Sequence, residues 1–417
     1  MSQNQMIINT VKITNKRIDI NYSVIGEWKK FFNSEIPFFV EYSKPIDQVP
    51  ENIAIIPFIV NILPVAWLFN AQIIVNEIDE EFYNSINEFK QGYKEMYPQL
   101  NFLGEIISKR KIANPKIMNS KSAVFFSGGV DAYQTLISHI NENPTLVTLW
   151  GSDITLEDIE GWNIVEEHTK NVSTKYNLDY VVIKSSFRNF LNENILSEYT
   201  YPRVNDGWWH GFQHGIGLIG HMAPYAFQYN IQNIYIASSF TIEDKGKVTC
   251  ASDPSIDNKI KFSSSNVFHD GYEYNRQQKI HQLCNYVKSS GQKLQLRVCW
   301  ESSGGSNCCK CEKCCRTILG IIAEKENPRD YGFNYSDKEF SKMILNMRTL
   351  IPIKSNFRYK YIQNALVTNY TPEEVDKRLK WFMQMNIEDN SLSFSEKIYK
   401  FIGKARKFVR LIKGKLN

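Results

Sequence analysis

The sequence has little excess charge of either sign and lacks the marks of an exported chain. Lysine and arginine number 49 against 44 aspartates and glutamates, which does not by itself indicate a nucleic-acid partner. The first residues, MSQNQMIINTVKIT, lack the basic region, apolar core and cleavage site of a secretory signal. Internal repeats and low-complexity tracts are absent too. We therefore expect a folded, cytoplasmic chain whose 417 residues form two or three packed units.

A long uninterrupted apolar run is also lacking. The most apolar stretch, residues 53–69 (IAIIPFIVNILPVAWLF), is near membrane-spanning length, but Pro57, Asn61 and Pro64 would interrupt a spanning helix. A transmembrane segment is therefore disfavoured. We predict instead a buried strand, a turn marked by proline and a second buried element.

The hydrophobic patterns divide most of the chain into two predicted domains. Residues 1–115 combine β-patterned runs with a helix from Glu80 to Tyr97, which indicates an N-terminal α+β domain. The polar segment 109–121 marks its end. Residues 116–325 alternate short apolar strands with helices, the pattern of an α/β domain with a doubly wound parallel sheet.

The last part of the chain is predicted to be mostly helical. A final strand of the central domain is expected at LQLRVCW, residues 294–300. Residues 326–417 then form a helical C-terminal region, in which TPEEVDKRLKWFMQM should begin a helix with Thr371 as its cap.

A glycine-rich turn follows the first predicted strand of the central domain. In AVFFSGGVDAYQTLISHI, five residues stand between a buried strand and a helix: Ser127, Gly128, Gly129, Val130 and Asp131. Glycines let the backbone approach an anion and a helix start offers free N–H groups, so a pyrophosphate could bind there, with Mg²⁺ held by Asp131. A plain strand-to-helix turn is the alternative. A Walker loop and a dinucleotide fingerprint are excluded because their Lys-Ser or Lys-Thr pair and GxGxxG are missing.

This strand–loop–helix resembles the PP-loop ATP pyrophosphatases. Their SGG-x-D-S signature holds the β- and γ-phosphates of ATP while a substrate attacks the α-phosphate. The resemblance implies a PP-loop, HUP-like fold, ATP and Mg²⁺ as cofactors, and Ser127 and Asp131 as catalytic residues. SGGVDA departs from the signature at Ala132, which removes one hydroxyl and would alter the handling of ATP.

Six of the eight cysteines are clustered late in the chain, too densely for a disulfide framework in a chain of this size. Four of them form a C-x8-C-x2-C-x2-C pattern that could bind Zn²⁺ tetrahedrally: Cys299, Cys308, Cys311 and Cys314. Cys309 and Cys315 are assigned to packing or to the surroundings of the ligands. Free buried cysteines are disfavoured because the loop is polar, and an iron–sulfur cluster is the stronger alternative.

The glycine turn and the cysteine pattern, which is followed by Arg316, together resemble the 7-cyano-7-deazaguanine synthase family of queuosine biosynthesis. The resemblance covers about residues 122–317 and leaves both flanking regions outside it. In that family four cysteines near the C-terminus bind zinc. The resemblance implies a ligase that activates a carboxylate as its adenylate and lets ammonia displace AMP.

Several polar residues are tentative substrate ligands. Two of them, Ser238 and Asp253, follow the carboxyl end of a predicted strand, where ligands of doubly wound sheets bind, and the others could bind the substrate acid or steer the leaving pyrophosphate. The full set is Ser238, Asp253, His269, Asp270 and Arg276. For the last three, in HDGYEYNRQQKIH, the alternative is a helix capped by Asp270 with a solvated, salt-bridged face.

The block WWHGFQHGIGLIGH places His210 and His214 four residues apart on a predicted helix. No acid follows in an HExxH arrangement, so packing of an aromatic helix on the sheet is favoured over a metal site. A substrate wall of tryptophan and histidine is the other alternative.

Residues 396–417 carry eight lysines and arginines against one glutamate, and their apolar residues recur at helical spacing. Packing of this basic amphipathic helix on the enzyme body is favoured over peripheral contact with an anionic membrane. A nucleic-acid role is not favoured, because no other basic and aromatic stripe accompanies it.

These predictions combine in an ATP-dependent carbon–nitrogen ligase. Its partners would be a small-molecule carboxylic acid and an amine or ammonia, and its zinc would be structural. A PP-loop tRNA-modifying enzyme and a non-catalytic nucleotide-binding scaffold are the alternatives. The sequence leaves the acid and the oligomeric state open, a homo-oligomer included.

Overall fold

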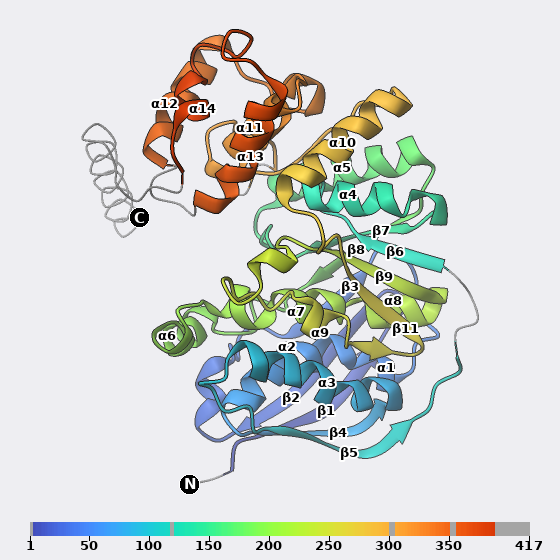
Figure 1. Ribbon diagram of the computed structural model, residues 1–417. Helices are drawn as coiled ribbons and strands as arrows, with labels where there is room; N and C mark the ends of the chain where they lie inside the picture. Colours follow the sequence, from blue (N-terminus) through green and yellow to red (C-terminus); the bar gives the residue numbers. More distant parts are fainter. Residues whose placement is uncertain (1–2, 117–120, 300–304, 351–355, 388–417) are drawn as a thin grey trace. The chain divides into compact units, whose positions relative to one another are not determined.

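The computed structural model describes residues 3–116, 121–299, 305–350 and 356–387 (Figure 1). The chain forms two compact units, each made of two segments. The first unit contains residues 1–127 and 135–273, and the second contains residues 128–134 and 274–417.

The first unit is built on one α/β sheet, with eleven strands among the described residues. The strand order is β10-β11-β9-β6-β7-β8-β3-β2-β1-β4-β5. Most pairs are parallel, including the continuous block from β11 to β8, as expected for a doubly wound sheet. The strands are β1 Gln5–Ile13, β2 Arg17–Ile25, β3 Phe38–Tyr42, β4 Gln72–Asp79, β5 Glu105–Ile112, β6 Lys121–Phe125, β7 Thr145–Trp150, β8 Tyr180–Ser185, β9 Ile231–Ala237, β10 Lys261–Phe262 and β11 Ser265–Asp270.

The predicted boundary at residues 109–121 does not coincide with the division between the two units. Strand β3 pairs antiparallel with β8, with Glu41 opposite Lys184, so the strands of residues 1–115 extend the same sheet as the later ones. The polar segment 109–121 begins within the edge strand β5 and ends at the first residue of β6. Local composition marks a loop, but it does not say whether the strands on either side of the loop belong to one sheet.

Helices lie against the sheet (Figure 1). α1, α2 and α3 contact β4, while α5 contacts β7 and β8. The helices that begin and end in the first unit are α1 Glu51–Ala54, α2 Ile56–Leu68, α3 Glu80–Met96, α5 Ile159–Tyr176, α6 Glu193–Val204, a π-helix Trp209–Gln213, α7 His214–Ile219, α8 Met222–Tyr229 and α9 Pro254–Asp257, with short 3-10 helices at Glu27–Phe31, Ile140–Glu142 and Ile242–Asp244. The predicted helix at Glu80 is confirmed, and Asp79 caps it by accepting a hydrogen bond from the Phe82 N–H.

The prediction of a strand and a turn in residues 53–69 is wrong, because most of this stretch is helix α2. The helix is buried on almost every side, so its sequence shows no amphipathic period. Pro57 lies in the first turn, where no backbone donor is needed, and the interior Pro64 is tolerated. No helix in the described ranges combines the length and apolarity needed to cross a membrane.

The second unit is helical. Its helices are α10 Arg276–Ser290, α11 Glu312–Ala323, a 3-10 helix Pro328–Tyr331, α12 Asp337–Leu350, α13 Asn356–Asn369 and α14 Lys380–Gln384. α4, Val130–Ser138, begins in this unit and ends in the first. The prediction of a helical C-terminal region is therefore confirmed for the described residues. The basic amphipathic helix predicted at residues 396–417 lies outside them.

Two sequence predictions for the second unit need correction. Residues 294–299 form no strand, and their backbone bonds to single partners, such as Leu296 N to Tyr331 O at 3.0 Å. The segment after Thr371 begins with turns, and regular helix starts only at Lys380. Thr371 and Glu374 do exchange the hydrogen bonds of a capping box, so the sequence signal for a cap was real but the helix it predicted is not continuous.

A buried histidine makes the stability of the first unit dependent on pH. His221 is fully buried, with Nδ1 2.5 Å from Gly217 O and Nε2 2.9 Å from Ser185 Oγ. Burial lowers its pKa to about 4, although the bond to Gly217 opposes the shift. The unfolded chain therefore takes up this proton at a higher pH than the folded chain does, and acid favours unfolding.

We expect the free energy of unfolding to fall by roughly 3 kcal/mol as the pH drops from about 6.5 to about 4, since one pKa unit is worth about 1.4 kcal/mol. Urea unfolding across this range measures the effect. His221→Gln, whose amide can still donate to Gly217 O, should remove that part of the pH dependence. An identical pH dependence in the variant would contradict the assignment.

Candidate functional site

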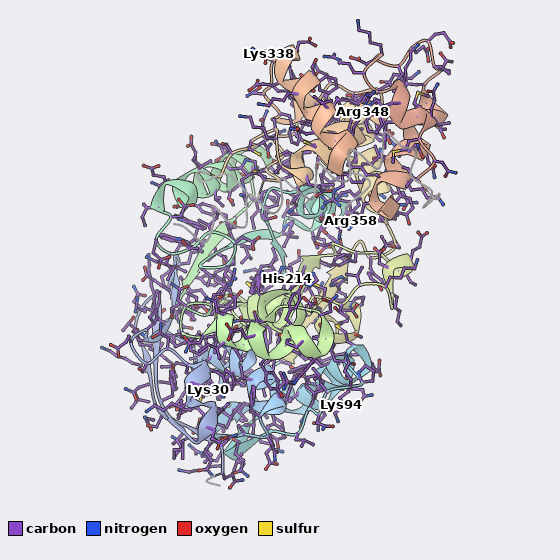
Figure 2. All side chains as sticks on the ribbon, turned by 90° about the vertical axis from the view of Figure 1, so that its left-hand side faces the viewer. Lys30, Lys94, His214, Lys338, Arg348 and Arg358 are labelled. Atoms are coloured by element: carbon purple, nitrogen blue, oxygen red, sulfur yellow. The ribbon has the colours of Figure 1, made fainter. Side chains whose placement is uncertain are left out.

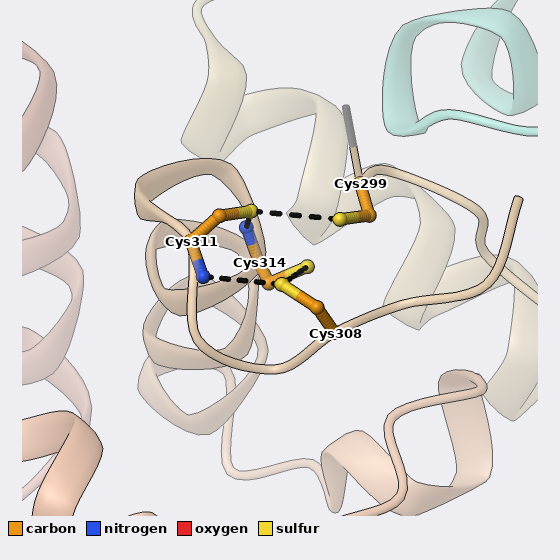
Figure 3. Close-up of side chains that lie close together, drawn as sticks. All are labelled: Cys299, Cys308, Cys311 and Cys314. Atoms are coloured by element: carbon orange, nitrogen blue, oxygen red, sulfur yellow. Dashed lines mark hydrogen bonds between the residues drawn. The ribbon is translucent and has the colours of Figure 1, made fainter. Parts of the chain in front are cut away.

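The four predicted cysteine ligands converge in the second unit (Figure 3). Their sulfur atoms all lie within 4.8 Å of one another. Cys299 Sγ is 3.8 Å from Cys311 Sγ, and Cys308 Sγ is 4.0 Å from Cys314 Sγ. Zinc–sulfur bonds of about 2.3 Å in a tetrahedron require sulfur–sulfur distances of about 3.8 Å. The cluster therefore has the dimensions of a site for a metal ion such as zinc.

The local backbone shapes this cluster. Cys311 caps helix α11 and accepts a hydrogen bond from Cys314 N at 3.4 Å, while Cys308 Sγ accepts one from Cys311 N at 3.2 Å. The side chain of Asn307 braces the loop by accepting from Val298 N at 2.9 Å and donating to Leu296 O at 2.7 Å. These hydrogen bonds hold residues from two parts of the sequence around one point.

Protons are shared unevenly among these thiols. The pKa of Cys311 falls to about 5, because the thiol of Cys314 and nearby N–H groups donate to its thiolate. The pKa of Cys314 rises for the same reason, since its proton is held by the neighbouring thiolate. The sulfur atoms therefore favour at least one negative charge, as a site that binds a cation should.

The other two cysteines of the cluster lie outside the four-sulfur group. Cys309 has a positive φ of 51° and its thiol faces Asn307 O at 3.8 Å. Cys315 is fully buried on α11, and burial raises its pKa. Both are placed as packing residues rather than as ligands.

The glycine turn lies between β6 and α4, as predicted. Ser127 is exposed and is the last residue of segment 1–127 of the first unit. Gly128 is the first residue of segment 128–134 of the second unit. Gly128 has φ of 76°, which favours glycine, and its carbonyl accepts a hydrogen bond from Arg297 N at 2.7 Å. Gly129 O accepts the first helical hydrogen bond, from Tyr133 N, so the N-terminus of α4 directly follows the two glycines.

Asp131, in the first turn of α4, has cationic partners on both carboxylate oxygens. Arg276 Nη2 is 3.0 Å from Oδ2, and Lys279 Nζ is 3.5 Å from Oδ1. Burial alone would raise the pKa of Asp131, but these cations together with Lys313 and Arg316 outweigh burial and lower it. These cations favour the binding of an anion beside Asp131 over the binding of a further cation. Direct binding of Mg²⁺ by this carboxylate, as predicted, would add such a cation.

A basic cluster surrounds Asp131 in the second unit. It consists of Arg276, Lys279, Lys313, Arg316 and Arg358, the last labelled in Figure 2. The carboxylates of Asp131 and Glu312 also act on this cluster. Nη1 of Arg276 is buried without a hydrogen-bond partner among the described residues. A buried donor of this kind favours a ligand that brings a hydrogen-bond acceptor.

Three of the predicted substrate residues have structural partners in the first unit. Asp253 caps α9 by accepting from Ser255 N at 2.8 Å, and His269 Nδ1 lies 2.8 Å from the buried Asp257 carboxylate. Asp270 is the last residue of β11 and pairs with His139 at 3.1 Å, so it does not cap the following helix as the alternative predicted. That cap is Asn275.

Ser238 and Asp270 are brought together at the carboxyl ends of β9 and β11, where Ser238 N donates to Asp270 O at 2.8 Å. For Ser238 this position agrees with the reason for selecting it. Arg276 begins α10 in the second unit and contacts Asp131. The tentative substrate residues therefore belong to different parts of the molecule.

Sequence reasoning missed four members of the basic cluster: Lys279, Lys313, Arg316 and Arg358. One signal was available, because Arg276 and Lys279 are three residues apart and so share a helix face, as do Lys313 and Arg316. No local pattern placed these faces around Asp131.

The comparisons with known proteins assign no family. The sequence matches no model of a protein family, and no curated protein matches it.

Proposed function

We propose that this protein is an ATP-dependent carbon–nitrogen ligase of the PP-loop type, similar to the 7-cyano-7-deazaguanine synthase family. Its substrates would be a small carboxylic acid, or the corresponding amide, and ammonia or an amine. AMP and pyrophosphate would be the other products.

The observation that carries the proposal is the basic cluster beside the glycine turn and the N-terminus of α4. The triphosphate of ATP is a polyanion, and the arginine and lysine side chains of the cluster would help to neutralise it. Gly128 and Gly129 leave the backbone open to close approach, and the first turn of α4 adds its dipole. Arg276 Nη1 would then gain the partner that it lacks in the described structure.

Bound ATP would supply the activated phosphorus that turns a carboxylate oxygen into an adenylate. The residues of the chain would bind and orient. Arg276 and Lys279 hold the departing pyrophosphate, and Asp131 keeps their side chains in place through its two ion pairs. We expect Mg²⁺ to reach the site on the phosphates of ATP. Ala132, buried beside Asp131, offers no second hydroxyl.

The four cysteines would hold zinc in a structural role. All four coordination positions are taken by sulfur, which leaves none for a substrate. The ion would connect residues 299 and 308 to the start of α11, the helix that carries Lys313 and Arg316. Metal binding would thereby fix part of the basic cluster.

Release of labelled pyrophosphate from ATP labelled at the γ-phosphate tests the proposal. The full chain is incubated with Mg²⁺, ammonia and pools of carboxylic acids. Release that depends on one acid pool supports the ligase. Release that requires added RNA would replace it with RNA modification. ATP binding without release, across all acids and with RNA, would overturn it in favour of a non-catalytic nucleotide-binding scaffold.

A further inference from the structure

The small net charge of the whole chain conceals an uneven distribution between the two units. The second unit carries 27 lysines and arginines against 14 aspartates and glutamates, whereas the first carries 22 against 30. The excess in the second unit remains when residues 388–417 are left out, at 19 against 11. Such a separation of charge is typical of a unit that meets a polyanionic partner.

Part of this charge gathers where helix α12 meets the segment that leads into α14. Arg378 joins the two, because its Nη1 donates to Asp337 Oδ1 at 2.8 Å and to Ser341 Oγ at 2.9 Å. Four exposed lysines, here called the lysine group, lie next to these residues or one helical position away and make no ion pair among the described residues: Lys338, Lys342, Lys377 and Lys380.

Two adjoining hollows mark this surface. Their volumes are about 670 and 280 Å³, and Arg378 lines both. Asp337 and Asp376 line both as well, but each pairs with Arg378, at 2.8 and 2.5 Å. Glu373, in the larger hollow, is the lining carboxylate that makes no ion pair with any described residue. The four lysines therefore outnumber the unpaired carboxylates that line the hollows.

Aromatic rings lie between arginines in the smaller hollow. Tyr335 and Phe340 stack, with ring centroids 5.6 Å apart and planes 18° apart. The guanidinium of Arg329 lies 5.5 Å from the centre of the Tyr335 ring, and that of Arg378 lies 4.5 Å from the centre of the Phe340 ring. Phe340 is buried, whereas Tyr335 is partly exposed. A partly exposed ring that is held by its neighbours offers a flat surface for another planar group.

A second pair of a ring and an arginine lies in α14, next to Lys380. The guanidinium of Arg348, labelled in Figure 2, is 5.0 Å from the centre of the partly exposed Trp381 ring. Trp381 Nε1 is buried and has no hydrogen-bond partner among the described residues. The rings and cations of this surface are spread over residues 329–381, so the sequence shows no stripe of alternating basic and aromatic residues.

We propose that this surface of the second unit binds single-stranded regions of folded RNA. The lysine group contacts phosphates, and Tyr335 stacks on an unpaired base. Unpaired bases can reach a ring in a hollow, whereas the bases of a duplex are already stacked on one another. An anionic membrane fits less well, because α12 and α14 expose one large hydrophobic side chain among their described residues, Leu345. This binding does not depend on the proposed ligase reaction.

The affinity of the metal-loaded full chain for a fluorescent single-stranded RNA of about 12 nucleotides tests the proposal, measured by anisotropy without ATP. We expect the double variant Lys338→Glu with Lys342→Glu to bind about tenfold more weakly, or worse, at about 0.1 M salt. The slope of log affinity against log salt should also become shallower by about 1 or more, since each phosphate contact to a single strand contributes about 0.7.

Lys30→Glu with Lys94→Glu is the matched control. Both are exposed lysines of the first unit, labelled in Figure 2, and the pair changes the net charge by the same amount. We expect an affinity within about twofold of the unmodified protein, because salt screens charges that lie far from the RNA. Both double variants should keep the metal content and thermal unfolding of the unmodified protein. An equal loss of affinity in the control would reflect net charge alone and would overturn the proposal.

Tyr335→Leu separates stacking from charge. Removal of the ring should weaken binding about tenfold, the usual order of a base stacked on an aromatic side chain. The salt slope should stay the same, because no phosphate contact is lost. A duplex RNA of the same sequence should bind more weakly than the single strand. Unchanged affinity in Tyr335→Leu, or a duplex bound as tightly as the single strand, would contradict stacking and with it the proposal.

Vesicles of phosphatidylserine and phosphatidylcholine test the membrane alternative with the same variants. We expect Lys338→Glu with Lys342→Glu to change RNA binding and to leave sedimentation with vesicles as it is in the unmodified protein. The reverse result, with vesicle binding lost and RNA binding retained, would make this surface a membrane site. None of these measurements contains ATP or a carboxylic acid, so an inactive ligase would not affect their outcome.

Discussion

Removal of the metal from the four-cysteine site is expected to unfold the neighbouring part of the second unit. Structural zinc contributes about 10–16 kcal/mol in zinc-finger peptides, comparable to the whole stability of a typical domain. Cys311→Ser removes a proposed ligand, while the serine hydroxyl can still cap α11, so a loss of protection in that helix would report the loss of the ion. Hydrogen exchange should show lost protection in α11 and α13, which contact each other.

Cys309→Ser is the matched control because Cys309 lies in the same loop but outside the four-sulfur group. It should keep one zinc per chain and the exchange pattern of the unmodified protein. Metal analysis on the same samples separates zinc from iron, and visible absorption would reveal an iron–sulfur cluster. Full protection in metal-free protein would show that the ion is not structural.

Loss of Arg276 is expected to reduce acid-dependent pyrophosphate release by about 100-fold or more, the typical effect of removing one donor that stabilises transition-state charge. Arg276→Met keeps much of the side-chain volume and removes the guanidinium that carries the unpartnered Nη1. Most of the loss should appear in kcat, because pyrophosphate charge increases as the reaction proceeds.

Arg329→Met, which changes an exposed arginine of the same unit, should leave the rate within about twofold, as expected of a surface substitution away from the site. Both variants should show the same zinc content, and Arg276→Met should be folded at the assay temperature, although loss of the ion pair with Asp131 should lower its melting temperature. Asp131→Ala should also be slow, because Arg276 and Lys279 lose the carboxylate that fixes them. If Arg276→Met retained full activity, the basic cluster would not be the phosphate site.

The α/β class and the order of most elements could be predicted from the sequence, because strands and amphipathic helices leave local periodic patterns. The four-cysteine cluster could be predicted too, since three of its members lie within seven residues of one another and loop geometry brings them together. Helix α2 could not, because a helix buried on almost every side has no polar face and no period to detect.

Other features were decided only by the tertiary structure. The pairing of β3 with β8 joins residues 1–115 to the central sheet, and no local signal states which strand will be a neighbour. The basic cluster around Asp131 comes from α10, α11 and α13. Sequence thus determined which side chains with reactive or charged groups are present. Packing of distant segments determined which of them meet, because hydrogen bonds and ion pairs act only over a few ångströms.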